Sequence, residues 1–227
     1  MKIDCVSDLH GAYPILEGGD LLIVAGDWTG SDRMEQYVEF FNWVYEQKYA
    51  KKVLIAGNHD MLLQNQDYRG PEGVVRNSFT YLQDSGTEFH GLKIWGTPWT
   101  KTFLGMNPDC MAFTCDTELQ LARKWRQIPL DTDILITHSP PFGVMDQSSS
   151  LHRCGSKTLS RRIRDLKNLK LHVFGHIHEG HGHCWQYDET VNAVDPKDPK
   201  PFGHQYVNAA IMDENYRPIN KPIRIVL

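Results

Sequence analysis

Short apolar runs that stop abruptly at polar residues recur along this chain and limit its fold more than any other feature. The runs are rich in Leu and β-branched residues, and they cover residues 1–6, 21–25, 53–56, 134–136 and 171–174. Runs of this length and composition are typical of strands buried in the sheets of α/β proteins. We therefore expect an α/β fold whose strands carry polar residues at their carboxyl ends.

Each run is followed at once by side chains that bind metal ions or transfer protons. In chain order they are Asp8, His10, Asp27, Asn58, His59, Asp60, His138, His176 and His178. Functional sites in α/β sheets lie at the carboxyl ends of the strands. Packing alone does not explain why five separate segments deliver Asp, Asn and His to one edge, so the pattern predicts a site assembled there.

The types of donor indicate which ions such a site takes. Oxygen and imidazole ligands without thiolate suit Mn, Fe, Zn or Co better than a structural zinc ion. Seven of the nine residues are candidate ligands: Asp8, His10, Asp27, Asn58, His138, His176 and His178. Seven ligands are too many for one tetrahedral ion, but they suit two ions about 3.5–4 Å apart that share a carboxylate. Asp27 stands alone on its strand and is central in order, which makes it the expected bridge.

Composition narrows the class of protein. The 227 residues fit one domain, which we expect to span residues 1–227. The formal net charge of −4 argues mildly against a nucleic-acid surface, and the odd number of cysteines without C-x-x-C spacing argues against a disulfide framework. No apolar run is long enough to cross a bilayer and no signal peptide precedes the first strand, so we expect no membrane contact and a cytoplasmic location.

Helices and antiparallel strands are expected between the apolar runs. One helix is capped by Ser31 or Asp32 and closed by the lysines at 48, 51 and 52. A second helix begins with a Thr117–Gln120 capping box. A third helix runs from Ser156 to about residue 167. The apolar positions expected to face the core are 34, 37, 38, 41, 44 and 45 in the first helix and 119, 122 and 125 in the second. Antiparallel strands are expected at 79–82, 87–89, 92–95, 183–187, 205–212 and 223–227, with a proline-containing loop between 187 and 205. Two stacked sheets with helices outside accommodate this order.

The polar clusters resemble the signature of the calcineurin-like metallophosphoesterase superfamily. D-x-H at 8–10, G-D-x-x at 26–29, G-N-H-D at 57–60, the lone His138 and G-H-x-H at 175–178 occur in the family's order. The resemblance covers nearly the whole chain and implies a four-layer α/β/β/α sandwich with two mixed β-sheets and a dinuclear metal site. It implies that Asp8, His10, Asp27 and His178 hold one ion and that Asp27, Asn58, His138 and His176 hold the other. His59 would be the non-ligand histidine beside the substrate, with Asp60 orienting it.

Further stretches are similar to the small phosphodiesterase branch related to the brain protein 239 group, among them residues 81–85, 95–99, 175–180 and 222–227. Leu9 departs from the Thr expected in that branch, but it is not a ligand. Some members of the branch lack the first histidine of G-H-x-H and are inactive, whereas His176 is present here. The resemblance therefore implies an active phosphodiesterase for small esters such as cyclic nucleotides. Its cofactors would be two divalent ions, Mn, Fe, Zn, Co or Ni, with Mn the ion expected to work in vitro.

Other functions stay open at this stage. A protein or nucleotide phosphatase of the same superfamily would carry G-D-x-x-D-R-G, and residues 26–31 lack its Arg. A DNA nuclease would want a basic groove, and a non-catalytic scaffold of this fold tends to lose ligands that are intact here. The sequence leaves the oligomeric state undecided. It also leaves undecided whether the substrate meets Trp28, Trp99, Phe142, His152, His181 or His183.

Overall fold

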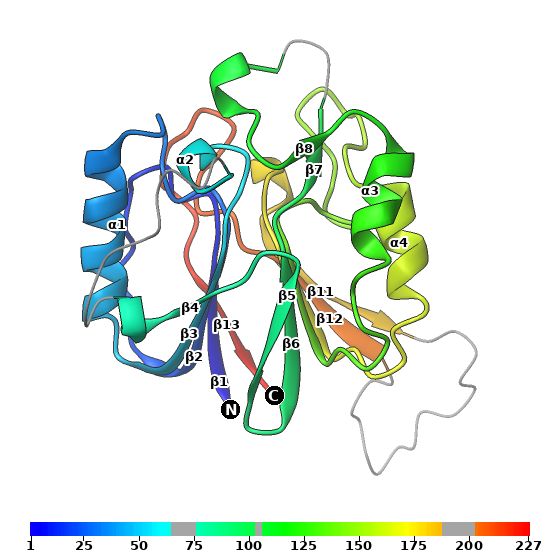
Figure 1. Ribbon diagram of the computed structural model, residues 1–227, viewed down its shortest axis with the longest axis horizontal. Coiled ribbons are helices and arrows are strands. Elements are labelled where there is room, and N and C mark those ends of the chain that lie inside the picture. Colours follow the sequence, from blue (N-terminus) through cyan, green and yellow to red (C-terminus); the bar gives the residue numbers. More distant parts are fainter. Residues whose placement is uncertain (65–75, 103–105, 188–202) are drawn as a thin grey trace.

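Two stacked β-sheets form the centre of the computed structural model, which describes residues 1–64, 76–102, 106–187 and 203–227 (Figure 1). The first sheet has the order β13-β1-β2-β3-β4 and the second has the order β11-β12-β10-β9-β6-β5. Strands β1 to β4 run parallel and so do β12, β10, β9 and β6, while β13, β11 and β5 pair antiparallel at the edges. Both sheets are therefore mixed.

The first sheet consists of β1 (Lys2–Val6), β2 (Gly19–Ala25), β3 (Tyr49–Ile55), β4 (Thr80–Tyr81) and β13 (Ile223–Val226). The second consists of β5 (Ser85–Phe89), β6 (Leu92–Thr97), β9 (Ile134–Thr137), β10 (Leu171–Phe174), β11 (Gly182–Tyr187) and β12 (Gly203–Asn208). A small separate sheet joins β7 (Thr100–Lys101) to β8 (Thr114–Cys115). The helices are α1 (Met34–Glu46), α2 (Met61–Gln64), α3 (Glu118–Trp125) and α4 (Lys157–Ile163), and the 3-10 turns are η1 (Arg76–Ser78), η2 (Pro108–Cys110) and η3 (His178–Gly180).

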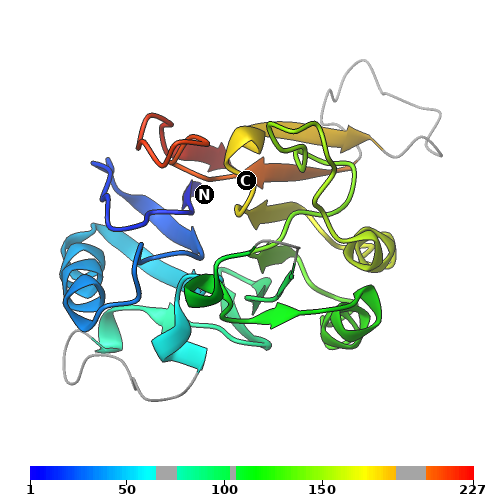
Figure 2. The same ribbon diagram turned by 90° about the horizontal axis from the view of Figure 1, so that it is seen from above.

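Alternation along the strands explains the layers. In β2, Leu21 and Ile23 point into the core between the two sheets, while Leu22 and Val24 pack against α1 on the outer face. On the outer face of the second sheet, the core includes residues of β9 and β10 together with residues of α3 and α4. The helices thus flank the sheets on both sides (Figure 2), which confirms the α/β/β/α sandwich.

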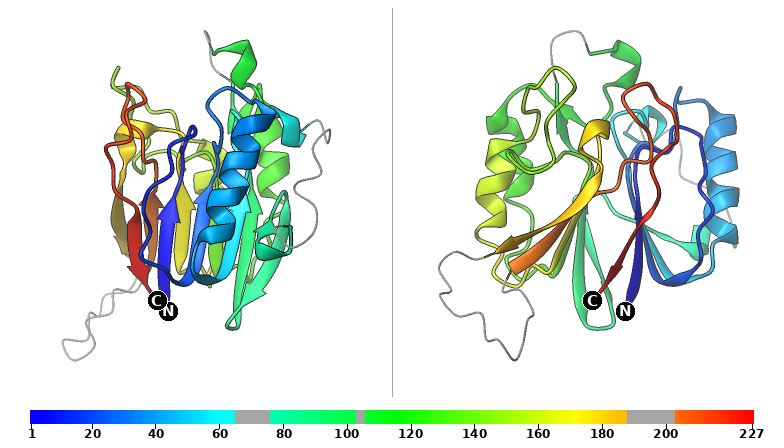
Figure 3. Two further views of the ribbon diagram at one scale, coloured as in Figure 1. Left: turned by 90° about the vertical axis from the view of Figure 1, so that its left-hand side faces the viewer. Right: turned by 180° about the vertical axis from the view of Figure 1, so that it is seen from behind.

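Edge strand β13 brings the two ends of the chain together, as Figure 3 shows. The Arg224 guanidinium donates to both carboxylate oxygens of Asp4 on β1, each at 2.7 Å. The N-terminal amine also donates to the Leu227 carbonyl at 2.6 Å. The antiparallel strand expected at 223–227 is therefore confirmed, and it completes the sheet that carries the first three polar clusters.

Helix α1 differs in detail from the expected helix. Its N-cap is Arg33 and no side chain caps it, and three of the positions expected to face the core, at 34, 38 and 45, are exposed. Phe40, which the pattern missed, is buried instead. The lysines do not extend the helix, because β3 begins at Tyr49, but Lys52 of that strand donates its Nζ to the carbonyls of Val44 and Tyr45 at 2.7 and 3.0 Å. A cation therefore does lie at the carboxyl end of α1, but it comes from the neighbouring strand β3.

The segment at 79–82 was expected to be antiparallel, and this expectation was wrong. Its strand β4 pairs parallel with β3 at the edge of the first sheet. The hairpin of β5 and β6 is confirmed, and His90 and Gly91 in its turn have φ of 49° and 76°. Pairing of β11 with β12 is confirmed as well, whereas the proline loop between them lies outside the described residues, apart from its ends.

The capping box at the start of α3 is confirmed. Thr117 Oγ1 accepts from the backbone N–H of Gln120 at 3.2 Å, and Gln120 Oε1 accepts from the Thr117 N–H at 2.9 Å. The expected apolar face was partly wrong, because Leu119 is exposed and Leu121 is buried. Ser156 caps α4 as expected, but that helix ends at Ile163.

Replacing Thr117 by Ala should lower the free energy of unfolding by about 1 kcal/mol, because the backbone N–H of Gln120 at the start of α3 loses its hydroxyl acceptor. Chemical denaturation monitored by circular dichroism measures the change. Thr117→Ser keeps the hydroxyl and serves as the matched control. Equal stability of the Ala and Ser variants would contradict the role of the cap.

Within the described part of the chain, none of the helices combines the length and the apolar character needed to cross a bilayer.

Candidate metal centre

The carboxyl ends of β1, β2, β3, β9 and β10 lie at one end of the stacked sheets, opposite the two chain termini (Figure 1). The loops that follow these strands carry all nine residues predicted from the sequence. Backbone hydrogen bonds tie the loops together, since the N–H groups of Leu9 and His10 donate to the Asp27 carbonyl at 2.8 and 3.1 Å. The predicted convergence of separate segments at one edge is therefore observed.

Four residues of this cluster hold a left-handed backbone. The φ angles are 53° at Asp8, 45° at His10, 53° at Asp27 and 69° at His176. This region is unfavourable for residues that have a Cβ atom, and such strain gathers where function requires a particular direction of a side chain. The chain turns sharply at each of these points, directly after a buried strand.

Three of the four histidines predicted as ligands share one orientation, as does His59. In each, Nδ1 lies within hydrogen-bond distance of a backbone carbonyl, and these pairs are His10 with Thr29 (3.3 Å), His138 with Ala25 (2.9 Å) and His178 with Asp213 (2.9 Å). A carbonyl at Nδ1 directs Nε2 toward the centre of the cluster, which is the usual arrangement of metal-binding histidines. All three Nε2 atoms lie close to the carboxylates described next.

Asp27 is the centre of the cluster. Its Oδ2 lies 3.3 Å from His138 Nε2, 3.7 Å from His10 Nε2 and 4.0 Å from His59 Nε2. The other oxygen, Oδ1, accepts from the His59 backbone N–H at 2.9 Å, so the carboxylate cannot swing away. Asp27 occupies the central position that the sequence predicted for a bridging carboxylate.

Asp8 and His178 form a second grouping next to Asp27. Asp8 Oδ1 lies 3.4 Å from His178 Nε2, and both Asp8 oxygens accept from the His176 backbone N–H at 3.0 Å. The Nε2 atoms of His10 and His178 face each other at 3.4 Å. In the described part of the chain, three sets have ligand atoms within 4.8 Å of one another: Asp8 with His10 and His178, His10 with Asp27 and His59, and Asp8 with Asp27 and His138.

Asn58 and His176 complete the cluster on the side of His138. The Asn58 amide nitrogen donates to the Cys110 carbonyl at 3.0 Å, which aims its Oδ1 at His138 Nε2, also at 3.0 Å. The ring centroid of His176 lies 5.0 Å from that of His138. All seven residues predicted as ligands therefore belong to one continuous cluster.

The electrostatics of the cluster favour cations. Burial lowers the pKa of His10 to about 4 and that of His176 to about 3, so both imidazoles are neutral donors at physiological pH. Burial acts in the same direction on His138, but the Asp27 carboxylate outweighs it and raises the pKa of His138 to about 9. The buried carboxylates thus attract positive charge, which suits divalent ions.

Glycines allow the close approach of these loops. A Cβ atom on Gly175 would lie 2.1 Å from Asp8 Oδ2, and one on Gly57 would lie 2.2 Å from Asp27 Oδ1. A Cβ atom on Gly26 would lie 2.4 Å from His138 Nδ1. Such distances exclude any larger residue, so each glycine is required by a neighbouring carboxylate or imidazole.

The residues present fit a pair of hard or borderline divalent ions. Carboxylate, amide and imidazole donors converge, backbone carbonyls lie at Nδ1 of His10, His138 and His178, and the Asp27 carboxylate lies close to the imidazoles of both His10 and His138. This arrangement can bind phosphoryl oxygens and activate water when ions are held there.

His59 and Asp60 lie where the sequence placed them, but their contacts differ from the expected ones. His59 Nδ1 is 3.3 Å from the Gly30 carbonyl, so a backbone atom makes the orienting contact that was assigned to Asp60. The Asp60 carboxylate accepts from the backbone N–H groups of Gly57 at 2.8 Å and Trp28 at 3.1 Å. Asp60 therefore fastens the loop that carries Asp27 to the loop that carries Asn58 and His59.

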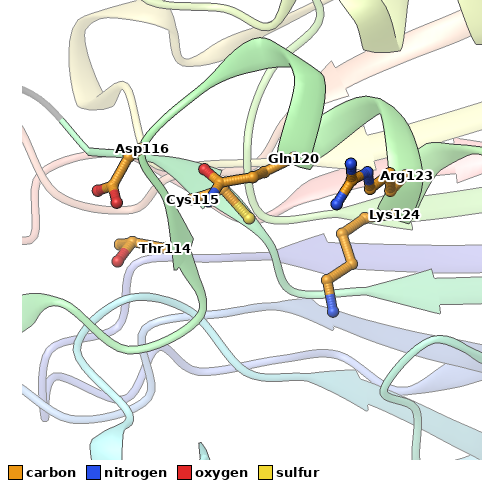
Figure 4. Close-up of a pocket in the computed structure, with 6 residues that line it drawn as sticks. All are labelled: Thr114, Cys115, Asp116, Gln120, Arg123 and Lys124. Carbon is orange, nitrogen blue, oxygen red and sulfur yellow. The ribbon is translucent and has the colours of Figure 1, made fainter.

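A cavity of about 1270 Å³ opens beside the cluster and includes Asp27, Asn58, His59, His176 and His178 in its lining. Its further wall is built by Lys101, Phe142, Arg153, Lys157 and Tyr216 among others. A smaller cavity of about 280 Å³ lies at the start of α3, between Thr114, Asp116 and Lys124 (Figure 4), and none of the nine predicted residues lines it.

The structure separates the aromatic and histidine residues whose roles were left undecided. Phe142 and His152 line the large cavity. Trp28 is buried and stacks on Phe40 at 4.5 Å, while Trp99 donates its indole N–H to Asp84. His183 pairs with Gln205 within the second sheet, and one ring nitrogen of His181 is buried.

Tyr216 was missed by the sequence analysis. It lies in the loop between β12 and β13, and its ring centroid is 5.0 Å from His10, 5.1 Å from His178 and 6.4 Å from His59. A lone Tyr in a polar loop gives no periodic signal. The turn-forming Asp213 and the Pro218 that follows were the available signs of an ordered loop there.

An α/β/β/α sandwich with carboxylates and imidazoles gathered at its strand ends defines the class of metallophosphoesterases. Comparison with known proteins agrees, because the calcineurin-like phosphoesterase family matches residues 1–180. The chain belongs to this family, whose members are phosphoester hydrolases that depend on two metal ions.

Individual relatives extend the match. Metallophosphoesterase domain-containing protein 1 of Homo sapiens is 34% identical over 248 residues, which cover 98% of this chain and 70% of the human protein, and the Mus musculus protein of that name gives the same values. One solved structure superimposes with a TM-score of 0.65 at 15% identity, over 99% of this chain and 98% of that chain. The Thermus thermophilus protein TT1561 gives a TM-score of 0.57 at 16% identity, over 99% and 97%. These two likenesses show the fold.

Proposed function

We propose that this protein is a dinuclear metal-dependent phosphodiesterase that hydrolyses small phosphodiesters, with cyclic nucleotides as the expected class. The observation that carries the proposal is the common orientation of His10, His138 and His178. Each holds Nδ1 at a backbone carbonyl and turns Nε2 toward the buried carboxylates of Asp8 or Asp27. Such a cluster is built for binding cations.

The proposed roles are those that the resemblance to the family implies, and the convergence of these residues supports them. Asp8, His10, Asp27 and His178 would hold one ion, and Asp27, Asn58, His138 and His176 would hold the other. Bound ions of this kind lower the pKa of a coordinated water and offset the charge on phosphoryl oxygens. His59 lies at the cavity and donates a proton to the leaving alkoxide, while its ring is held by the Gly30 carbonyl.

A preference for diesters is supported by space and by charge. The cavity of about 1270 Å³ has room for an organic group on each side of a phosphodiester. The loop after Asp27 continues as Trp28, Thr29 and Gly30, so the Arg with which related phosphatases grip a monoester dianion is missing from it.

The test is turnover of bis-p-nitrophenyl phosphate and p-nitrophenyl phosphate by protein stripped with a chelator and then given Mn. We expect activity to return with Mn and kcat/KM to be at least about tenfold higher for the diester, a difference of about 1.4 kcal/mol. A preference for the monoester would identify a phosphomonoesterase. No turnover of either ester with Mn, Fe, Zn, Co or Ni, in protein shown to hold two ions per chain, would point to a non-catalytic scaffold.

A further inference from the structure

Tyr216 combines contact with the metal centre and exposure to the cavity. Its ring leans against His10 and His178 at centroid distances of 5.0 and 5.1 Å, both with edge-on geometry. The side chain nevertheless remains 57% exposed and lines the large cavity. One side of the ring therefore touches the proposed ligands, while the rest faces the space in which a substrate would lie.

The backbone of Tyr216 is held in a conformation that is unfavourable for this residue. Tyr216 has φ of 58°, a conformation that a residue with a Cβ atom rarely adopts. The Asp213 carboxylate fixes the turn by accepting from the N–H of Asn215 at 2.9 Å, from the N–H of Arg217 at 2.8 Å and from Arg217 Nε at 2.7 Å. An exposed tyrosine kept in an unfavourable conformation by this many bonds is positioned for more than packing.

The same turn is joined directly to the metal centre. The Asp213 carbonyl accepts from the Tyr216 N–H at 3.0 Å, and it lies 2.9 Å from His178 Nδ1. One backbone oxygen thus sets the position of a proposed ligand and of the aromatic ring together. The loop that carries the ring is therefore linked directly to one of the proposed ligands.

We infer that Tyr216 is a substrate-contacting residue whose ring packs against a planar organic group of the phosphoester. This inference rests on the proposed function, because the reacting phosphate must lie at the carboxylates and imidazoles. An ester group extends from that phosphate toward the cavity, and a ring about 5 Å from the imidazoles is within reach of it. Planar aryl groups and nucleobases stack on such rings, whereas small alkyl groups gain little. Tyr216 therefore selects aryl or nucleoside esters over alkyl esters.

The decisive experiment measures binding, which does not depend on turnover. Phenyl phosphate and methyl phosphate are titrated by calorimetry into the Mn-loaded wild type and into Tyr216→Ala, Tyr216→Phe and Tyr45→Ala. Tyr45 is the matched control, since it is an exposed tyrosine on α1. We expect Tyr216→Ala to weaken phenyl phosphate about tenfold and methyl phosphate less than twofold. Tyr216→Phe keeps the ring and should bind both within twofold of the wild type.

The outcomes separate the two proposals. Unchanged affinity of Tyr216→Ala for phenyl phosphate overturns the inference, and so does an equal loss for both esters accompanied by fewer than two Mn ions per chain, because the role of the ring would then be structural. Absence of turnover in the wild type refutes the phosphodiesterase assignment alone. The selective loss of phenyl phosphate affinity would still establish the contact.

Discussion

Replacing Asp27 by Asn should abolish binding of both ions and lower kcat/KM for bis-p-nitrophenyl phosphate by at least ~10³-fold, or about 4 kcal/mol. The substitution keeps the shape of the side chain but removes its negative charge. Asp27 Oδ2 lies within 4.0 Å of the Nε2 atoms of His10, His59 and His138. Because His10 and His138 are proposed ligands of different ions, the change acts on both ion sites at once. Steady-state kinetics and metal analysis of the purified variant measure the two effects.

Asp20→Asn is the matched control. Asp20 lies at the opposite end of the same strand, β2, where its carboxylate accepts from the Lys2 backbone N–H at 2.6 Å. This control should keep two ions per chain and nearly full activity. An Asp27→Asn enzyme that retains both ions and more than about a tenth of the activity would exclude Asp27 as the bridge.

The sequence predicted the convergence of these residues because its signal is local. A buried strand followed at once by Asp, Asn or His forces that residue to the end of the sheet, and parallel pairing of β1, β2 and β3 then aligns three such ends. The pairing of β9 with β10 does the same in the second sheet. Residues as far apart as Asp8 and His178 therefore meet without any signal that links them directly.

What the sequence missed depends on contacts between distant segments. The carbonyls that fix the imidazoles, such as those of Ala25 and Asp213, have no side-chain signature, because any residue can supply them. The ring of Tyr216 reaches the site from a loop that has no hydrophobic period. Likewise, the direction of β4 is decided by its partner β3, and a strand of two residues carries no information about it.

The order of a motif also proved a poor guide to contacts within it. Asp60 directly follows His59, and the resemblance to the family implied that this carboxylate orients the imidazole. In the structure the carboxylate turns inward to backbone N–H groups of two loops, and the Gly30 carbonyl lies at His59 Nδ1 instead. A buried carboxylate lowers its free energy most where several N–H groups converge, and a single imidazole cannot match that.

His59→Ala should lower kcat by ~10²–10³-fold while two ions per chain remain bound, because the residue acts on the leaving group and not on the metals. The geometry makes this test sharp. His59 Nε2 lies 4.0 Å from Asp27 Oδ2, and His59 belongs to one of the sets whose ligand atoms lie within 4.8 Å of one another. His59 is therefore close enough to Asp27 and His10 to bind a metal ion itself. Metal analysis of the variant distinguishes this role from a role in proton transfer.

The choice of ester adds a second measurement. A proton donor matters most when the leaving group is a strong base, so the loss in His59→Ala should be larger for alkyl esters than for p-nitrophenyl esters. His90→Ala is the matched control, since His90 is an exposed histidine in the β5–β6 turn and should be silent in both assays. An equal loss for all esters together with a missing ion would make His59 a ligand. Unchanged turnover with intact metals would exclude both roles for His59.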